Sequence, residues 1–206
     1  VTSVLINVGI PWSQIDVVDG TATGWSSHLA DATELASYSA LFFACGLDES
    51  ELPLSAQARD GLRDFVEAGG NIYVSDQAYD LVEAIAPDAV EFFKDDAILS
   101  DAERGYPVED LPAIVTDPNL AQTLGTTSVP LRYPQIAWAV IESVSSDVRV
   151  LLRADAPISL HDVLTDVPHT IAFDLGQGKV VFSSFHQQAG ALPQMEAVLR
   201  ALMFEL

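Results

Sequence analysis

The stretch that decides the fold is GLRDFVEAGGNIYVSDQAYD, Gly61 to Asp80. Its first part carries apolar residues at helical spacing up to the pair Gly69-Gly70, which is typical of the end of a helix. The apolar run Asn71 to Ser75 then predicts a buried strand. Asp76 follows directly, and helical spacing resumes after it. The stretch therefore predicts a helix, a strand and a sharp turn into a second helix, which is a repeating unit of α/β folds.

Similar patterns predict further elements on both sides of this stretch. Apolar residues at helical spacing after Asp117-Pro118 and from Met195 onward predict helices. Two apolar runs around Gly176 and Gly178 predict a hairpin. The strands expected in chain order are Val4 to Val8, Ala40 to Cys45, Asn71 to Ser75, Ile136 to Val144, Val148 to Arg153, Thr170 to Leu175 and Lys179 to Phe185.

The order of these elements predicts a single α/β domain over residues 1–206. Apolar strands interleaved with amphipathic helices favour a three-layer, doubly wound, mostly parallel sheet with helices on both faces. The antiparallel hairpin is expected near the C-terminus. Residues 88–116 are polar and irregular, so we expect them to leave the main sheet as an excursion within the same domain.

The charge balance excludes several classes of partner. Nine Lys and Arg residues against 30 Asp and Glu residues give a formal net charge of −21. Such a surface repels nucleic-acid phosphates and anionic membranes, and no apolar run is long enough to span a bilayer. The carboxylates are spread along the chain, as in salt-adapted proteins. We therefore expect a soluble protein, either cytoplasmic in a salt-adapted organism or at the cell surface, without a nucleic-acid or membrane partner.

Metal-ligating residues do not occur at a recognised spacing, so no metal site and no cofactor is expected. A zinc site would have to combine His161, Asp162, Asp166 and His169. A solvent-exposed turn around Pro168 explains these residues more simply. An acidic cluster without a calcium-loop motif comprises Asp95, Asp96, Asp101 and Glu103. Trp138 lies in an apolar run and is expected in the core.

Three segments resemble the class I glutamine amidotransferase-like fold, taken broadly to include trehalose-utilisation-type relatives. YSALFFACG (Tyr38 to Gly46) resembles the strand that ends in the family's glycine-rich oxyanion turn. Gly61 to Asp80 resembles the helix, strand and nucleophile elbow. GKVVFSSFHQQAG (Gly178 to Gly190) resembles the final strand, which in the family ends in Phe-His-Pro-Glu. The resemblance implies that the carboxyl ends of these strands share one site.

The departures from the family pattern concern the catalytic residues. The family's elbow presents Cys between small residues, and a His with a Glu activates it. Here Asp76 occupies the nucleophile position, and Gln187 and Gln188 replace the Pro-Glu after His186. Cys45 lies in the oxyanion segment, where it replaces a glycine. The chain is therefore expected to be a divergent member that is not a glutamine amidotransferase.

The candidate site residues follow from this resemblance. No catalytic residue is assigned outright, and the candidates are Asp76, Ser75 and His186. The expected ligand-binding residues are Cys45, Gly46, Asp76, Gln77, His186 and Gln187. A purely structural interpretation is also open for Asp76, because aspartate is a preferred N-cap of a helix.

Two functions from different classes remain open. The missing Cys and Pro-Glu favour a non-catalytic amidotransferase-like domain that acts as a ligand-binding or structural interaction module, as part of a larger or cell-surface protein. The alternative is a hydrolase that uses Asp76 or Ser75 with His186 at the strand-to-helix elbow.

Overall fold

A computed structural model describes residues 2–45, 47, 49–95, 102–135, 138–185 and 192–205 of the chain. Its α-helices are α1 (Thr2–Asn7), α2 (Ala32–Leu35), α3 (Ala56–Glu67), α4 (Asp80–Ile85), α5 (Pro118–Leu124) and α6 (Pro193–Leu202). Short 3₁₀ helices are η1 (Trp12–Gln14), η2 (Trp25–Ala30), η3 (Glu49–Glu51) and η4 (Asp76–Ala78). The strands are β1 (Ala40–Phe43), β2 (Asn71–Ser75), β3 (Val90–Phe92), β4 (Val108–Val115), β5 (Ser128–Tyr133), β6 (Ile141–Val144), β7 (Arg149–Pro157), β8 (Val163–Leu175) and β9 (Gly178–Ser183).

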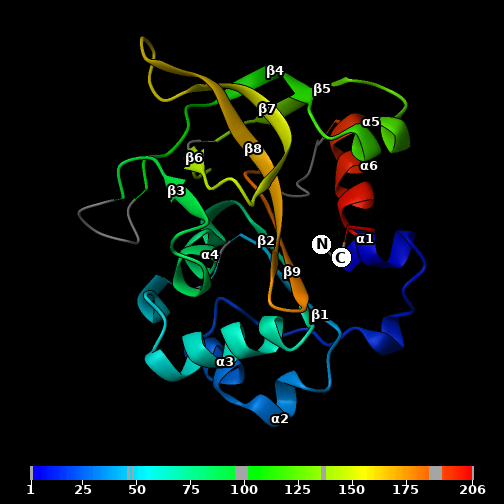
Figure 1. Ribbon diagram of the computed structural model, residues 1–206, viewed down its shortest axis with the longest axis vertical. Helices are drawn as coiled ribbons and strands as arrows, with labels where there is room; N and C mark the ends of the chain where they lie inside the picture. Colours follow the sequence, from blue (N-terminus) through cyan, green and yellow to red (C-terminus); the bar gives the residue numbers. More distant parts are fainter. Residues whose placement is uncertain are drawn as a thin grey trace.

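The main sheet is mixed, and it curls between two groups of helices (Figure 1). Its seven strands have the order β1-β2-β9-β8-β7-β4-β5. The neighbours β1, β2 and β9 are parallel, whereas every pairing from β9 through β8, β7 and β4 to β5 is antiparallel. The predicted α/β class and C-terminal hairpin are therefore confirmed. The predicted mostly parallel sheet is wrong, because antiparallel strands form more than half of it.

The decisive stretch folds as its sequence predicts. The Ser55 hydroxyl accepts a hydrogen bond from the Ala58 N–H at 3.2 Å and begins α3. The helix ends at Glu67 with Ala68 as its C-cap, and Gly69 follows with a φ of 111°, in the left-handed region that favours glycine. The chain then enters β2, whose residues Ile72 to Ser75 are buried. Local signals alone thus place the strand that leads into the predicted elbow.

Two predicted segments differ from the structure. The strand expected at Val4 to Val8 is wrong, because Thr2–Asn7 forms α1 and buries Val4 and Leu5. A short apolar run fits either conformation, and packing decides between them. The excursion expected at residues 88–116 is also wrong in part, since β4 lies between β7 and β5 in the sheet. Alternating burial along β4, with Leu111, Ala113 and Val115 inward, is the pattern of a sheet strand with one buried face.

The core lies on both faces of the central strands. Ile72 and Val74 of β2 belong to one apolar cluster with α3 and α4, whereas Tyr73 belongs to a second cluster with α6. Successive side chains of a strand point to opposite faces, so β2 separates the two clusters. Tyr73 therefore faces the second cluster, which also contains Tyr133 and Phe185.

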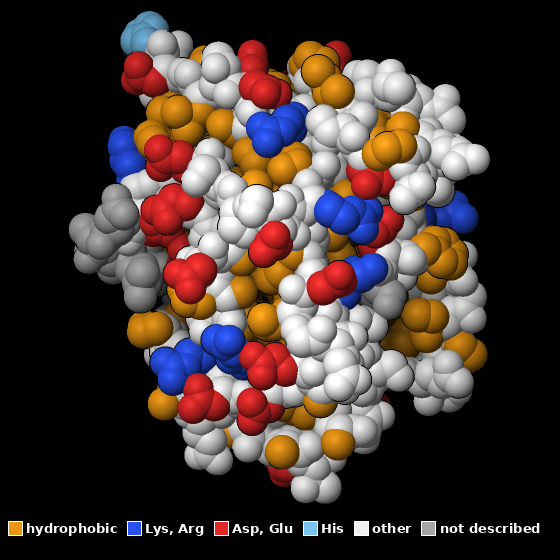
Figure 2. Space-filling model, viewed as in Figure 1, with side chains coloured by type: hydrophobic (Ala, Val, Ile, Leu, Met, Phe, Trp, Pro, Cys, Tyr) orange, Lys and Arg blue, Asp and Glu red, His pale blue; other side chains and the backbone are white. Residues whose placement is uncertain are grey.

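The visible surface mixes charges with apolar side chains (Figure 2). Asp and Glu side chains are scattered over this face, with Lys and Arg among them. Several ion pairs, such as Arg63 with Glu67 at 2.8 Å, join charges of opposite sign on the molecule. Among the described residues, no helix has the length and apolar character needed to cross a bilayer.

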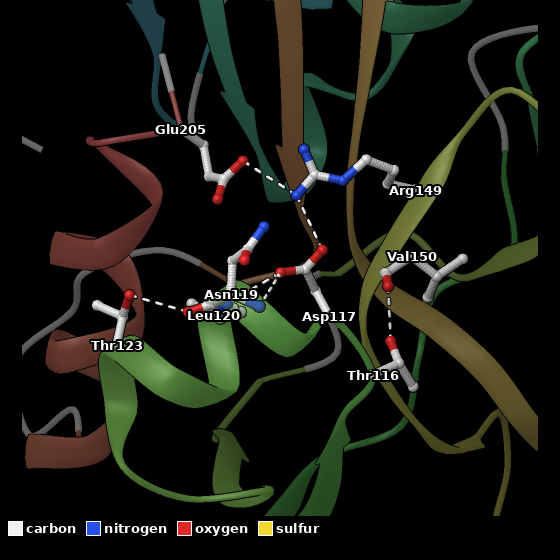
Figure 3. Close-up of polar contacts among 8 residues, drawn as sticks. All are labelled: Thr116, Asp117, Asn119, Leu120, Thr123, Arg149, Val150 and Glu205. Atoms are coloured by element: carbon white, nitrogen blue, oxygen red, sulfur yellow. Dashed lines mark hydrogen bonds and ion pairs between the residues drawn. The ribbon is translucent and has the colours of Figure 1, made fainter.

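Asp117 ties the start of α5 to the start of β7 (Figure 3). Its carboxylate accepts hydrogen bonds from the N–H groups of Asn119 and Leu120 at 2.9 Å each. It also forms an ion pair at 2.9 Å with Arg149, which in turn reaches Glu205 at 3.2 Å. Burial raises the pKa of Asp117, but the Leu120 N–H and the Arg149 guanidinium outweigh it and hold this pKa below its usual value.

Asp117→Ala is expected to lower the free energy of unfolding by about 1 to 2 kcal/mol, because the helix loses its N-cap. The difference in unfolding free energy between wild type and variant should be fully present above about pH 4. It should disappear as the pH falls through the lowered pKa, because the wild-type carboxylate is then protonated and loses its charge. Urea unfolding at neutral and acid pH measures both effects. Asp31→Ala is the matched control, since Asp31 caps the four-residue α2 through Thr33 and Glu34. Equal stability of Asp117→Ala and wild type would contradict this role.

Candidate functional site

The carboxyl ends of three parallel strands meet at one edge of the sheet. Phe43 of β1 lies opposite Val74 of β2, and Ser75 of β2 lies opposite Ser183 of β9. Cys45, Asp76 and Phe185 therefore follow neighbouring strand ends, and ligands of α/β sheets bind at such ends. Gly46, His186 and Gln187 lie outside the described residues, so their predicted part in binding stays a prediction.

Asp76 forms the turn between β2 and η4 in an uncommon backbone conformation. Its φ is 56°, in the left-handed region that a residue with a Cβ adopts at a cost of about 1 to 2 kcal/mol. Its side chain is buried, with 5% of the residue exposed. The N-cap positions of η4 and α4 are held by Ser75 and Tyr79, so the interpretation of Asp76 as an N-cap is wrong. Strain of this kind concentrates at functional sites, including nucleophile elbows.

The neighbours of Asp76 along the chain have different surroundings. The Ser75 hydroxyl is fully buried and donates a hydrogen bond to the Phe43 carbonyl at 3.2 Å. The Gln77 side-chain nitrogen Nε2 is buried and donates no hydrogen bond to any of the residues that the structure describes. A buried donor without an acceptor costs about 1 to 3 kcal/mol, so Gln77 holds unused binding capacity beside Asp76.

Tyr73 and Ser183 form a buried hydroxyl chain beneath the strand ends. The Ser183 hydroxyl donates to the Phe185 carbonyl at 2.5 Å, and its oxygen lies 2.7 Å from the Tyr73 hydroxyl. Because the serine proton is used on the carbonyl, the tyrosine donates to the serine. This chain fixes the backbone at Phe185, the last described residue before 186–191.

A second buried polar group surrounds Tyr133 at the end of β5. The Tyr133 hydroxyl lies 2.7 Å from both Nδ1 of His169 and the hydroxyl of Ser184. The Ser184 N–H donates to the His169 carbonyl at 2.9 Å. The expectation of a solvent-exposed turn is wrong for His169, which is fully buried in β8. Among the described residues no group of three or more His, Cys, Asp or Glu residues is placed to hold a metal ion.

These hydroxyls and the imidazole are neutral at physiological pH. Burial, reinforced by the charge of Asp76, raises the pKa of both Tyr73 and Tyr133. Burial lowers the pKa of His169 to about 3, although the Ala154 carbonyl opposes the shift. The site thus combines the buried carboxyl group of Asp76 with two neutral phenols.

Sequence reasoning missed Tyr133, His169 and Ser184. The sequence contained a signal for two of them. His169 lies two residues before the apolar run IAF, and Ser184 is the second of two serines in the predicted final strand. A buried histidine or serine must find a hydrogen-bond partner, so such a position predicts a polar contact in the core. The partner Tyr133 comes from a strand distant in sequence, and nothing local identifies it.

Comparison with known proteins shows a likeness of fold. No protein-family model matches the sequence, and no curated protein matches it. A Bacteroides uniformis structure described as ThuA-like has a TM-score of 0.60 and 15% identity, covering 88% of this chain and 74% of that one. A Thermoplasma acidophilum structure described as a GMP synthase subunit has a TM-score of 0.56 and 9% identity, covering 98% and 87%. A cytoplasmic protein from Salmonella typhimurium has a TM-score of 0.57 and 14% identity, covering 98% and 84%.

At these identities the likeness shows the fold alone. It agrees loosely with the resemblance to the amidotransferase-like fold, because ThuA-like and amidotransferase-type structures are both among the neighbours. The chain spans most of each of these three proteins. The loss of catalysis stays a prediction.

Proposed function

We propose that this chain is an amidotransferase-like domain whose elbow binds a small ligand without catalysing a reaction, as a ligand-binding or interaction module. The observation that carries the proposal is the conformation of Asp76, a buried carboxylate held in the left-handed region at the carboxyl end of β2. A strained, buried acid at a strand end costs stability, and such a cost persists where the residue has a use.

The surroundings of Asp76 favour binding over reaction. A serine nucleophile needs a hydroxyl that a base can reach, but Ser75 is buried and donates to the Phe43 carbonyl. A general base works best with a pKa near the working pH, whereas His169 has a pKa of about 3 and contacts Tyr133. The described part of the site therefore supplies hydrogen bonds and a fixed charge.

The same groups suggest the chemistry of the ligand. Asp76 offers a carboxylate acceptor, and Gln77 offers an amide donor that is otherwise unused. The net charge of −21 disfavours anions near the protein. We infer a small ligand that carries O–H or N–H donors and no negative charge.

The alternative is a hydrolase that uses Asp76 or Ser75 with His186. One observation favours it: the φ of 56° at Asp76 is the strained conformation that a nucleophile elbow requires. In that case the Asp76 carboxylate would attack the acyl carbon of an ester and expel its alcohol group, and water would hydrolyse the resulting anhydride to the free acid and regenerate Asp76.

Binding is tested by thermal unfolding with D-glucose, ethylamine, glutamate and phosphate as probes. A neutral or cationic probe at about ten times its Kd should raise the Tm by about 3 to 6 °C, and the anions should not. Asp76→Asn should abolish the shift, because asparagine tolerates the same φ but lacks the charge. Asp166→Asn is the matched control, since Asp166 also has a positive φ of 53° and lies far more exposed. Stronger stabilisation by the anions, or an unchanged response of Asp76→Asn, would overturn the proposal.

Catalysis is tested separately with p-nitrophenyl acetate. The wild-type protein is expected to release nitrophenol at the rate of buffer alone. A rate above buffer that disappears in Asp76→Asn or in Ser75→Ala would establish the hydrolase instead and would identify its nucleophile.

A further inference from the structure

The two edge strands of the main sheet, β1 and β5, differ in their protection against further pairing (Figure 1). β5 contains Pro130, which has no N–H, and the Arg132 N–H donates to the sulfur of Met195 at 3.2 Å. The Arg132 side chain also forms an ion pair with Glu109. Prolines and charges of this kind protect a sheet edge from pairing with another strand. β1 lacks both, because residues 36–45 include no proline and no charged side chain.

The backbone of β1 has unpaired groups along its outer edge. Ala40 lies opposite Asn71 of β2, and the Asn71 N–H donates to the Ser39 carbonyl at 3.1 Å. In a parallel pair only alternate residues of a strand bond to the neighbouring strand. The odd-numbered residues of β1 therefore bond to β2, and the N–H and C=O groups of Ala40 and Phe42 point away from it. Among the described residues, none forms a hydrogen bond with these outward groups.

The side chains along this edge are apolar and partly exposed on both faces of the sheet. Leu41 packs against the cluster that contains α3 and α4, whereas Phe42 packs against the cluster that contains α6. Neither side chain is fully buried, and Ser39 and Ala44 on either side of the strand are exposed. Partly exposed apolar side chains beside unpaired backbone groups are the features to which another strand is added.

We propose that β1 is a dimerisation edge, at which the β1 strands of two copies of this chain pair antiparallel across a two-fold axis and join their sheets. The outward groups are self-complementary in this arrangement. Ala40 of each copy lies opposite Phe42 of the other, and the two residues exchange both backbone hydrogen bonds, so that about four such bonds join the copies. On one face the large Phe42 packs beside the small Ala40, and on the other face Leu41 meets Leu41 of the second copy.

The charge pattern makes a second copy a suitable occupant of this edge. Each copy has a net charge of −21, so most contacts between two copies bring carboxylates together. Antiparallel pairing of residues 36–45 with themselves places no charge opposite another. The contact is isologous, so it closes at two copies. The remaining surfaces still repel each other over a Debye length of about 10 Å at 0.1 M salt and about 3 Å at 1 M, and dimerisation therefore strengthens with salt.

Sedimentation equilibrium tests the association. The wild-type protein should form a dimer with a Kd below about 0.1 mM in about 1 M NaCl, and this Kd should rise about tenfold or more in about 0.1 M NaCl. Ala40→Pro removes an outward N–H from each copy and no bond to β2, so the variant loses about half of the hydrogen bonds between copies. Its dimer should be weaker by about tenfold or more, while its far-ultraviolet circular dichroism stays that of the wild type. Ala40→Ser is the matched control, because it keeps the N–H and should dimerise like the wild type.

Cross-linking tests the register of the two strands. In a Cys45→Ser background, Leu41→Cys places two thiols opposite each other, with Cα atoms about 4.5 Å apart, a separation that a disulfide bond spans. Mild oxidation in about 1 M NaCl should therefore give a covalent dimer. Ala40→Cys is the control, since this residue faces Phe42 of the second copy and should cross-link much less. A monomeric wild type at about 1 M NaCl, equal dimerisation of Ala40→Pro and wild type, or equal cross-linking of the two cysteine variants would overturn the proposal.

Discussion

Acidification from about pH 7.5 to about pH 5 is expected to remove about 2 kcal/mol of unfolding free energy through His169 alone. Burial lowers the pKa of the folded His169 to about 3, whereas the unfolded chain binds that proton near pH 6.5. The stabilisation is complete above the unfolded pKa and is lost as the pH falls toward the folded one. Chemical denaturation at a series of pH values measures how steeply the free energy of unfolding changes with pH.

The control compares slopes, because the carboxylates of this acidic chain titrate over part of the same range. His169→Asn keeps a side-chain oxygen near the Tyr133 hydroxyl but does not titrate, so its stability should fall less steeply between about pH 7 and 5. His161→Asn, at an exposed position, should follow the wild-type slope. Parallel slopes for wild type and His169→Asn would show that the buried imidazole does not resist protonation.

Local signals in the sequence predict the part of the fold that carries the elbow. The Ser55 cap, the Gly69 stop and the strand before Asp76 depend on neighbours within a few residues, and all three are confirmed. The antiparallel half of the sheet depends on pairing between distant strands. β4 carries Glu109 and Asp110 at its start, and this polar beginning made the segment resemble a loop.

In the candidate site, too, some residues can be predicted from the local sequence and others cannot. Asp76 and Ser75 are found from the pattern of one strand and the turn after it, and the structure places both at the carboxyl end of β2. Tyr133, His169 and Ser184 come from three separate parts of the sheet, and their contact depends on the strand order β9-β8-β7-β4-β5. Spacing along one segment contains no information about that order, so the contacts among these buried groups could not be predicted.

Gly105→Ala is expected to lower the free energy of unfolding by about 3 kcal/mol. A Cβ at Gly105 would lie 1.9 Å from Cε2 and 2.0 Å from Cζ2 of Trp138, whose ring is buried and stacked on Tyr133 at 4.1 Å. The backbone cannot withdraw easily, because the Gly105 N–H donates to the Trp138 carbonyl at 2.9 Å. The indole must therefore move, and Tyr133 and His169 must follow. Urea unfolding and the tryptophan emission maximum measure the two consequences.

Gly125→Ala separates this clash from ordinary backbone strain. Gly125 has a φ of 69°, and apart from its two chain neighbours no atom of the described residues lies within 4 Å of the position that a methyl group would take. Its substitution should therefore cost only about 1 to 2 kcal/mol and leave the emission unchanged. Trp138→Leu combined with Gly105→Ala should cost less than the sum of the two single changes, because the smaller side chain makes room for the methyl group. Additive costs would show that the indole is not what Gly105 accommodates. The costs can be non-additive while the unfolding free energy of Gly105→Ala also falls less steeply than that of the wild type between about pH 7 and 5. In that case the same packing that excludes the methyl group also keeps His169 neutral.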